Sequence, residues 1–199
     1  NQTVLHSETL LVVSTQVRDP GHLDCPWLDQ AQPSLEDIDT AAQSRPIGET
    51  LVFGGGEPTL RTDFPSLIPL MPSNGILATD GLALHKEDVV QMLVERGLKR
   101  VRIPIHAARS DAHNWLVGIP GAHRRICQAI NTLTSNGVNV VTETTLTRPT
   151  VPYLEETIAF LYRLGIRNIQ LRMLERRGAA SDFFITSTSE ICPQHHTRD

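Results

Sequence analysis

Residues 54–59 (GGGEPT) combine a flexible backbone with a single carboxylate. Glycines allow backbone conformations and close approaches to a ligand that other residues do not allow. Glu57 would present a carboxylate beside them, and Pro58 would stiffen the chain that follows. Such a segment suits the grip of an ammonium group by a carboxylate and backbone carbonyls. An ordinary turn with an incidental acidic residue explains the same pattern as well.

Two further segments hold polar groups that could contact a ligand. Residues 79–81 (TDG) could supply such contacts or form a plain turn. His106, Asp111 and His113 lie within residues 105–115 (IHAARSDAHNW), and two histidines with an aspartate could bind a metal. Histidines in a loop are more often structural or solvated, so a metal site is the weaker interpretation.

Several reaction classes have no residues to support them. Lys86 and Lys99 are the only lysines, and neither follows an expected strand, which argues against a Schiff-base aldolase. The chain has no Gly-x-Ser-x-Gly motif, no P-loop lysine motif and no Gly-x-Gly-x-x-Gly spacing. Cys25, Cys127 and Cys192 lie far apart, so the sequence predicts neither a disulfide scaffold nor a local pair of thiolates.

The elements that would position these groups alternate between strands and helices. Six apolar, β-branched runs predict strands at residues 10–15, 50–54, 75–79, 100–105, 138–146 and 168–172. Most are nearly continuous apolar runs, which is typical of parallel strands covered on both faces. Helical periodicity fills the intervals at residues 85–97, 121–137 and 153–165, and less regularly at 34–44 and 63–71.

A glycine follows each of the three regular helices, at Gly97, Gly137 and Gly165. Glycine at this position ends a helix in the left-handed conformation, so the pattern predicts a repeated βα unit. Six such units form either an open partial barrel or a doubly wound sheet. Both architectures place their sites at the carboxyl ends of the strands.

Length and composition bound the rest of the prediction. A chain of 199 residues is most economically one domain, and we expect a partial (β/α)6 barrel over residues 1–176 with an irregular extension over 177–199. The net charge of −4 makes a nucleic-acid partner unexpected. No apolar stretch is long enough for a membrane helix, and we expect a cytoplasmic protein.

The sequence also resembles the radical S-adenosylmethionine (radical SAM) superfamily. The resemblance rests on GGGEPTL after the second strand, on residues 79–81, and on the long block over residues 101–166 with its GIPGA segment at 118–122. It covers residues 10–175. It implies a partial (β/α)6 barrel that binds S-adenosylmethionine.

The resemblance implies roles for individual positions. Gly55, Gly56 and Glu57 would contact the methionyl ammonium group of the cofactor, and Thr79 would lie near the cofactor. Residues on the fourth and fifth strands would reach its ribose and carboxylate. By their location these are Glu143, Thr145 and Arg148, whereas Pro104 stands where many relatives have a polar residue.

One part of the family pattern is missing. The family binds a [4Fe–4S] cluster through Cys-x3-Cys-x2-Cys after the first strand. Here the loop reads VRDPGHLDCPWLDQ, and Gly21, Cys25 and Leu28 occupy the three cysteine positions. Glycine and leucine cannot ligate iron, so the resemblance predicts a domain without the cluster.

Four hypotheses follow. The first is a domain that has lost its cluster ligands and still binds S-adenosylmethionine or a related nucleotide, with a non-radical or scaffold role. The second is an active radical enzyme with unconventional cluster ligation. The third is a non-radical barrel enzyme that uses Glu57, Asp80, His106 and Glu143 for acid–base or metal-assisted chemistry. The fourth is an interaction module, in which a protein partner or a second copy covers an exposed sheet edge. The sequence leaves open both a small-molecule and a peptide substrate.

Overall fold

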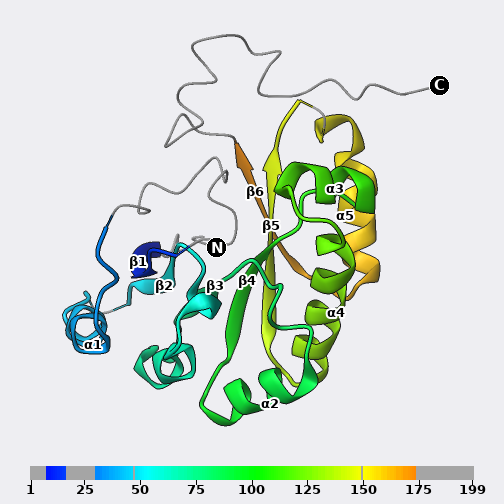
Figure 1. Cartoon of the computed structure of the whole chain (residues 1–199). Helices are drawn as coiled ribbons and strands as arrows, with labels where there is room; N and C mark the ends of the chain where they lie inside the picture. The colour runs from blue at the N-terminus through cyan, green and yellow to red at the C-terminus, as the bar shows by residue number, and fades with distance from the viewer. Residues whose placement is uncertain (1–7, 17–29, 47, 149, 174–199) are drawn as a thin grey trace, which may run out of the picture.

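The computed structural model describes residues 8–16, 30–46, 48–148 and 150–173. These residues form a single six-stranded parallel sheet with helices against it (Figure 1). The strands are β1 (Glu8–Ser14), β2 (Thr50–Gly55), β3 (Ile76–Ala78), β4 (Arg100–Pro104), β5 (Asn139–Leu146) and β6 (Asn168–Met173). Each strand pairs with the next one along the chain, so the order is β1-β2-β3-β4-β5-β6. The predicted α/β class is confirmed, and the strand ends agree with the predicted ends within two residues.

Helical segments connect the strands. The α-helices are α1 (Leu35–Gln43), α2 (Glu87–Glu95), α3 (Ser110–Val117), α4 (Ala122–Ser135) and α5 (Leu154–Arg163). Three 3-10 helices are η1 (Pro58–Leu60), η2 (Phe64–Leu70) and η3 (Val151–Tyr153). The strand order leaves β1 and β6 at the two edges, so the sheet is open, in agreement with a partial barrel.

Local sequence signals explain most helix ends. Ser34 caps α1, because its side chain accepts a hydrogen bond from the Asp37 amide while the Asp37 carboxylate accepts one from the Ser34 amide. Gly97, Gly137 and Gly165 all have positive φ, at 105°, 75° and 88°. The prediction that glycines end these three helices is therefore confirmed.

Two segments differ from the sequence-based expectation. Residues 106–115 were expected to be a loop, but Ser110–Val117 forms α3. The segment after η1 is a 3-10 helix, η2, which contains Pro65 and Pro69. Proline has no amide proton and clashes with the preceding helical turn, so a regular α-helix is disfavoured there.

The apolar core lies between the sheet and the helices. Alternate strand residues such as Phe53, Leu77 and Val101 pack in one core with Leu93 and Ile130 of the helices. The other face of the sheet lines the inside of the barrel and carries polar residues, including an ion pair of 2.6 Å between Arg102 and Glu8. One sheet thus has an apolar face for folding and a partly polar face that can meet a ligand.

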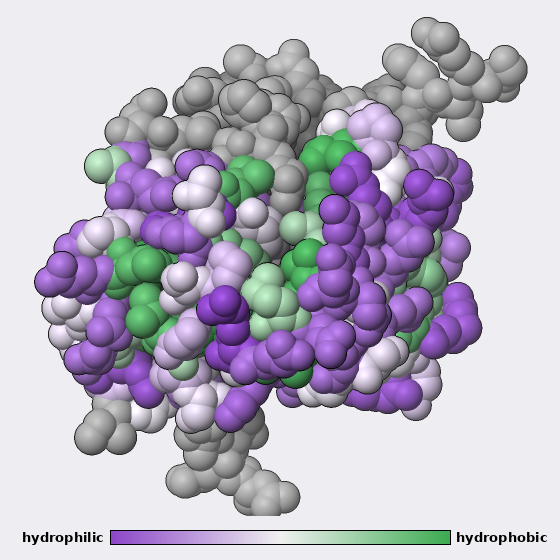
Figure 2. Space-filling model, turned by 60° about the horizontal axis from the view of Figure 1, so that its bottom comes forward, coloured by the Kyte–Doolittle hydropathy of each residue, from purple (hydrophilic) through white to green (hydrophobic). Residues whose placement is uncertain are grey.

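The surface that Figure 2 brings forward is largely hydrophilic, with apolar side chains in small groups between polar ones. None of the helices in the described ranges is long and apolar enough to cross a membrane. The predicted extension over residues 177–199 lies outside the described residues.

Candidate functional site

Parallel strands bring the predicted site residues to one end of the sheet. The turn after β2 contains Glu57, the turn after β3 contains Thr79 and Asp80, and β5 carries Glu143 and Thr145. The carboxyl ends of the strands in such a sheet are where ligands bind. The candidates therefore divide into a β2–β3 group and a β4–β6 group at this end.

The carboxylate of Glu57 is buried in hydrogen bonds. Its Oε1 atom accepts from the amide of Thr59 at 2.9 Å, from the Thr59 hydroxyl at 2.5 Å and from the Thr79 hydroxyl at 2.7 Å. Its Oε2 atom accepts from the Asp80 amide at 2.6 Å. Only 5% of Glu57 is exposed, and these hydrogen bonds make its carboxylate join the turn after β2 to the turn after β3.

Burial is the largest influence on the pKa of the Glu57 carboxyl group. Desolvation, with the negative charge of Asp80, raises the pKa of Glu57 to about 7. The hydrogen bonds donated by Asp80, Thr59 and Thr79 act in the opposite direction. Glu57 thus changes its protonation state within the range of ordinary buffers.

Close backbone packing explains Gly55 and Gly56. A Cβ atom on Gly56 would lie 2.2 Å from the carbonyl oxygen of Gln16, and one on Gly55 would lie 2.7 Å from that of Ser14. The amide of Gly56 donates to the Ser14 carbonyl at 2.7 Å, and the amide of Glu57 donates to the Gln16 carbonyl at 2.6 Å. These glycines bring the backbone close to the end of β1, where the sequence alone suggested closeness to a ligand.

Arg61 reinforces the same corner, and sequence reasoning missed it. It is 5% exposed and donates from Nη1 to the carbonyls of Val13, at 2.6 Å, and Pro33, at 2.9 Å. Its Nε and Nη2 atoms each lie 2.7 Å from an oxygen of Asp63. Arg61 thereby holds the end of β1 against the chain that enters α1. The sequence offered one indication of this role, because Arg61 follows the GGGEPT segment by two residues.

The β4–β6 group is organised around two contacts. Glu143 pairs with Arg172 of β6 at 2.9 Å, and 60% of the Arg172 side chain is exposed. The Nδ1 atom of His106 accepts a hydrogen bond from the Thr145 amide at 3.2 Å. Arg148 lies beyond β5 and is exposed. This group presents both a carboxylate and guanidinium groups at the open side of the barrel.

The metal interpretation of residues 105–115 is wrong for the described part of the chain. His113 lies on α3 and is fully buried, and its Nδ1 accepts from the His106 amide at 3.1 Å. Burial lowers the pKa of His113 to about 3, so the ring stays neutral. Asp111 instead pairs with Arg109 at the surface. No group of three His, Cys, Asp or Glu side chains in the described ranges could hold a metal ion.

The residues of the acid–base hypothesis make separate contacts in the structure. Glu57 is hydrogen bonded to the Asp80 amide, whereas Glu143 is paired with Arg172 and His106 with the Thr145 amide. Each group is thus engaged locally.

The cysteines do not provide an iron–sulfur ligand set in the described residues. Cys127 lies on α4, packs against the apolar core and has its Sγ 3.7 Å from Nδ1 of His123. Burial raises the pKa of the Cys127 thiol, which disfavours the thiolate that binds iron. Cys25 and Cys192 lie outside the described residues.

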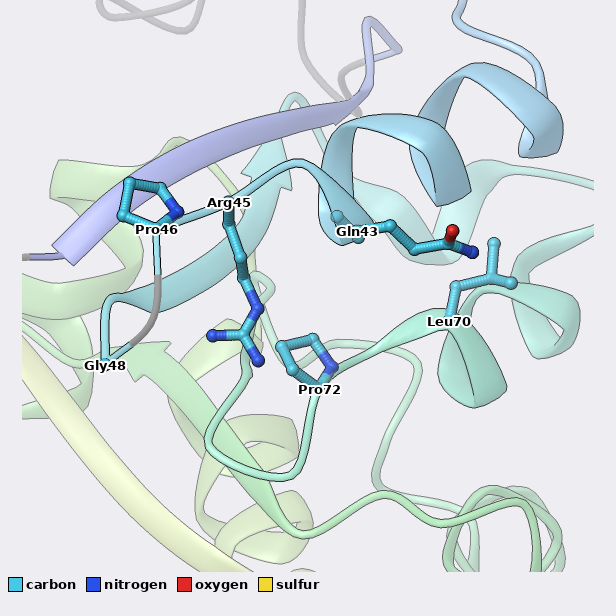
Figure 3. A pocket seen from close by; sticks show the side chains of 7 residues that line it. Gln43, Arg45, Pro46, Gly48, Leu70 and Pro72 are labelled. Atoms are coloured by element: carbon cyan, nitrogen blue, oxygen red, sulfur yellow. The ribbon is translucent and has the colours of Figure 1, made fainter.

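A separate cavity of about 380 Å³ lies where the chain enters β2 and β3 (Figure 3). The guanidinium of Arg45 extends between Gly48 and Pro72 in this cavity, and its Nη1 donates to the Glu49 carbonyl at 2.9 Å. The cavity precedes the strands, so it is not part of the site at their carboxyl ends.

Comparison with solved structures places this fold among known ones. The sheet and helices match Streptococcus suis SuiB bound to the precursor peptide SuiA, with a TM-score of 0.67 and 16% identity, over 86% of this chain and 40% of that chain. They also match native anSMEcpe with bound AdoMet and the Kp18Cys peptide, with a TM-score of 0.62 and 16% identity, over 83% of this chain and 51% of that one. At this identity the likeness concerns the fold.

Part of this chain is also similar in sequence to characterised proteins. The chain is 28% identical over 134 residues to an AdoMet-dependent heme synthase of Oleidesulfovibrio alaskensis, which covers 66% of this chain and 34% of that protein. It is 30% identical over 112 residues to the 7,8-dihydro-6-hydroxymethylpterin dimethyltransferase of Methanocaldococcus jannaschii, covering 48% of this chain and 22% of that protein. The chain thus spans about a third or less of these relatives.

The family comparison covers the elements from α1 to α5. The radical SAM superfamily pattern matches residues 28–161, which include the GGGEPT segment, Glu57, Thr79 and Glu143. This match extends over more than half of the chain and agrees with the fold of the solved structures. The chain therefore belongs to the radical SAM superfamily.

Proposed function

We propose that this domain binds S-adenosylmethionine at the carboxyl ends of its strands and builds no [4Fe–4S] cluster from its own cysteines. Its role is then non-radical, as a binding domain or a scaffold. The observation that carries the binding proposal is the intact corner at Gly55, Gly56 and Glu57, where every group is fixed by a hydrogen bond or by close packing.

The polar groups at this end suit the charges of S-adenosylmethionine. The ligand carries an ammonium group, a sulfonium and a carboxylate, and opposite charges recognise each of them. Asp80 and Glu143 are the carboxylates of this end that suit the cationic part, and Arg172 and Arg148 are the guanidiniums that suit the carboxylate. The surroundings of Gly54 are apolar. A Cβ atom added there would lie 3.1 Å from Cδ1 of Leu10 and 3.2 Å from Cβ of Ala78.

In this proposal the site residues divide their work. The backbone of Gly55 and Gly56 meets the ligand's ammonium group, while the side chains of Glu57 and Thr79 hold that backbone in place. On the other side of the opening, Glu143 and Thr145 meet the ribose, and Arg148 meets the methionyl carboxylate.

The proposal that the chain builds no cluster of its own rests on the cysteine spacing. The family's three ligands lie within eight consecutive residues, whereas the nearest cysteine to Cys25 in this sequence is Cys127. Cys127 lies against the core on α4. One thiolate with His22 or Asp24 would be an exceptional iron–sulfur site.

Calorimetry with S-adenosylmethionine, together with iron and sulfide analysis of anaerobically reconstituted protein, tests the proposal. We expect saturable binding without stoichiometric iron. Glu57→Ala should weaken binding at least tenfold, whereas the exposed Glu95→Ala on α2 should not change it. Stoichiometric iron and sulfide would refute the loss of the cluster, and absence of binding would refute the cofactor site.

A second candidate is an active radical enzyme that takes cluster ligands from a partner protein. The names of the relatives favour it, since an AdoMet-dependent heme synthase is among them. The partner and its substrate, a small molecule or a peptide, stay predictions, as does a second copy over the open edge. Formation of 5′-deoxyadenosine under strong reductant would establish this candidate in place of the first.

A further inference from the structure

A second cavity, of about 470 Å³, lies at the opposite end of the sheet from the proposed cofactor site. Five strands contribute their first residue to its wall, in the order Glu8, Ile76, Arg100, Asn139 and Asn168. Because the strands are parallel, these first residues gather at the amino end of the barrel. Figure 2 turns this end of the molecule forward, and the surface there is mostly hydrophilic.

The charge around this cavity is positive, although the whole chain carries −4. Arg100 and Arg167 line the wall, and Arg102 lies on the same strand as Arg100, two residues further along. The only carboxylate among the lining residues is Glu8, which is paired with Arg102 at 2.6 Å. Arg100 and Arg167 thus give the wall more positive than negative charge, and the guanidinium of Arg167 also lies over the Tyr162 ring at 4.0 Å.

These arginines are incompletely satisfied by protein acceptors. The Nε atoms of Arg100 and Arg102 are buried and have no hydrogen-bond partner among the described residues. Arg102 is only 5% exposed, so water does not readily replace the missing acceptor. Arg100 donates from Nη1 to the Asn74 carbonyl at 3.2 Å, and Arg167 donates to the carbonyls of Tyr162 and Ile166. Buried donors without acceptors cost free energy, and an anion would remove that cost.

Amide groups add further donors to the wall. The Nδ2 atom of Asn168 makes a long contact of 3.4 Å to Oδ1 of Asn139. Within the described ranges, no hydrogen bond uses the side chain of Gln170 or the Nδ2 atom of Asn139. Guanidinium and amide donors around one cavity are the groups that recognise carboxylate and phosphate oxygens.

We propose that this cavity is a binding site for a compact oxyanion, a carboxylate or phosphate group carried by a small molecule. Arg100 is its principal cation, and the amides of Asn139, Asn168 and Gln170 supply neutral donors. The site lies at the amino end of the barrel, because five of its residues begin strands, whereas Glu57 and Thr79 lie in the turns that follow β2 and β3. Gln170 of this cavity pairs in register with Glu143 of β5.

The test measures binding of two probes, inorganic phosphate and citrate, to the purified chain by calorimetry and by thermal unfolding. Sodium chloride at equal ionic strength is the reference, because it screens charge without offering an oxyanion. We expect at least one probe to bind with 1:1 stoichiometry and to raise the unfolding midpoint above the chloride reference. The probe that binds more tightly identifies phosphate or carboxylate chemistry. No binding of either probe would overturn the proposal.

Two variants locate the binding. Arg100→Gln should weaken it at least tenfold. Because that change also removes a contact to Asn74, the double variant Asn168→Asp/Gln170→Glu provides a second test that adds negative charge at partly exposed positions. It should also weaken binding at least tenfold.

The matched control is Gln128→Glu/Asn131→Asp, which adds the same charge at exposed positions of α4. It should bind as the unchanged protein does. Unchanged binding in both Arg100→Gln and Asn168→Asp/Gln170→Glu would place the anion elsewhere and overturn the proposal. S-adenosylmethionine binding is a separate measurement, so its failure would leave this result standing.

Discussion

The hydroxyl of Thr79 lies 2.7 Å from Oε1 of Glu57 and joins the turn after β3 to the turn after β2. The same hydroxyl accepts a hydrogen bond from the Gly81 amide at 3.2 Å. Both residues are buried, so this contact is shielded from water. The two turns that would face the cofactor are thereby positioned by one shared carboxylate.

Replacing Thr79 by Val should remove this link without changing the shape of the side chain. We expect a loss of about 2 kcal/mol in the free energy of unfolding, because a buried acceptor and a buried amide each lose a partner. Urea denaturation followed by circular dichroism measures it. Thr132→Val at a half-buried position of α4 is the matched control and should change stability little. Equal losses in the two variants would show that the Thr79 contact contributes nothing.

The pH dependence of stability should report the protonation of Glu57. Its folded-state pKa of about 7 lies above the ordinary value of 4.5, so the folded protein binds the proton more tightly. This contribution is complete below pH 4.5 and is lost as the pH rises toward 7, with a slope of about 1 kcal/mol per pH unit.

The measurement compares the unchanged protein with Glu57→Gln, whose side chain does not titrate. Urea denaturation at several pH values between 4.5 and 8 gives the difference in unfolding free energy, in which other titrating groups cancel. The unchanged protein should lose stability relative to the variant as the pH rises to 7, and the difference should then level off. A difference that is constant with pH would contradict the raised pKa.

Gly56→Ala should be costly for a steric reason. The new Cβ would lie 2.2 Å from the Gln16 carbonyl oxygen, so the backbone after β1 must move. We expect a loss of about 3 kcal/mol in unfolding free energy, together with weaker S-adenosylmethionine binding. Gly137→Ala is the comparison, because its positive φ of 75° adds strain while its Cβ position is open. That variant should lose about 1 kcal/mol and retain binding.

Two Arg-x-Asp ion pairs in this chain allow a buried arginine to be compared with an exposed one. Arg61 and Arg109 each contact the aspartate two residues later through two nitrogens. Only Arg61 is buried, and it also donates to the Val13 and Pro33 carbonyls. We expect Arg61→Gln to lose about 3 kcal/mol in unfolding free energy, since charged hydrogen bonds to buried carbonyls are lost. Arg109→Gln should have no measurable effect, and a similar loss in both would contradict this account.

Much of the fold could be predicted because its signals are local. Continuous apolar runs such as that around Phe53 and helix-ending glycines such as Gly137 depend on neighbours a few residues away. One segment that the sequence did not predict is α3, a helix of 8 residues that begins without a side-chain cap at Arg109. Its histidine, His113, is buried by contacts with other elements, which the local sequence does not reveal.

The sequence by itself determined the parallel α/β architecture, the family and the position of the candidate residues at the ends of strands. The tertiary structure alone decided what each side chain does there. Glu57 turns inward because donors from Thr59, Thr79 and Asp80 converge on it from separate segments. Arg100 and Asn168 line one cavity because β4 and β6 both pair with β5, and such long-range pairing leaves no mark in the sequence near either residue.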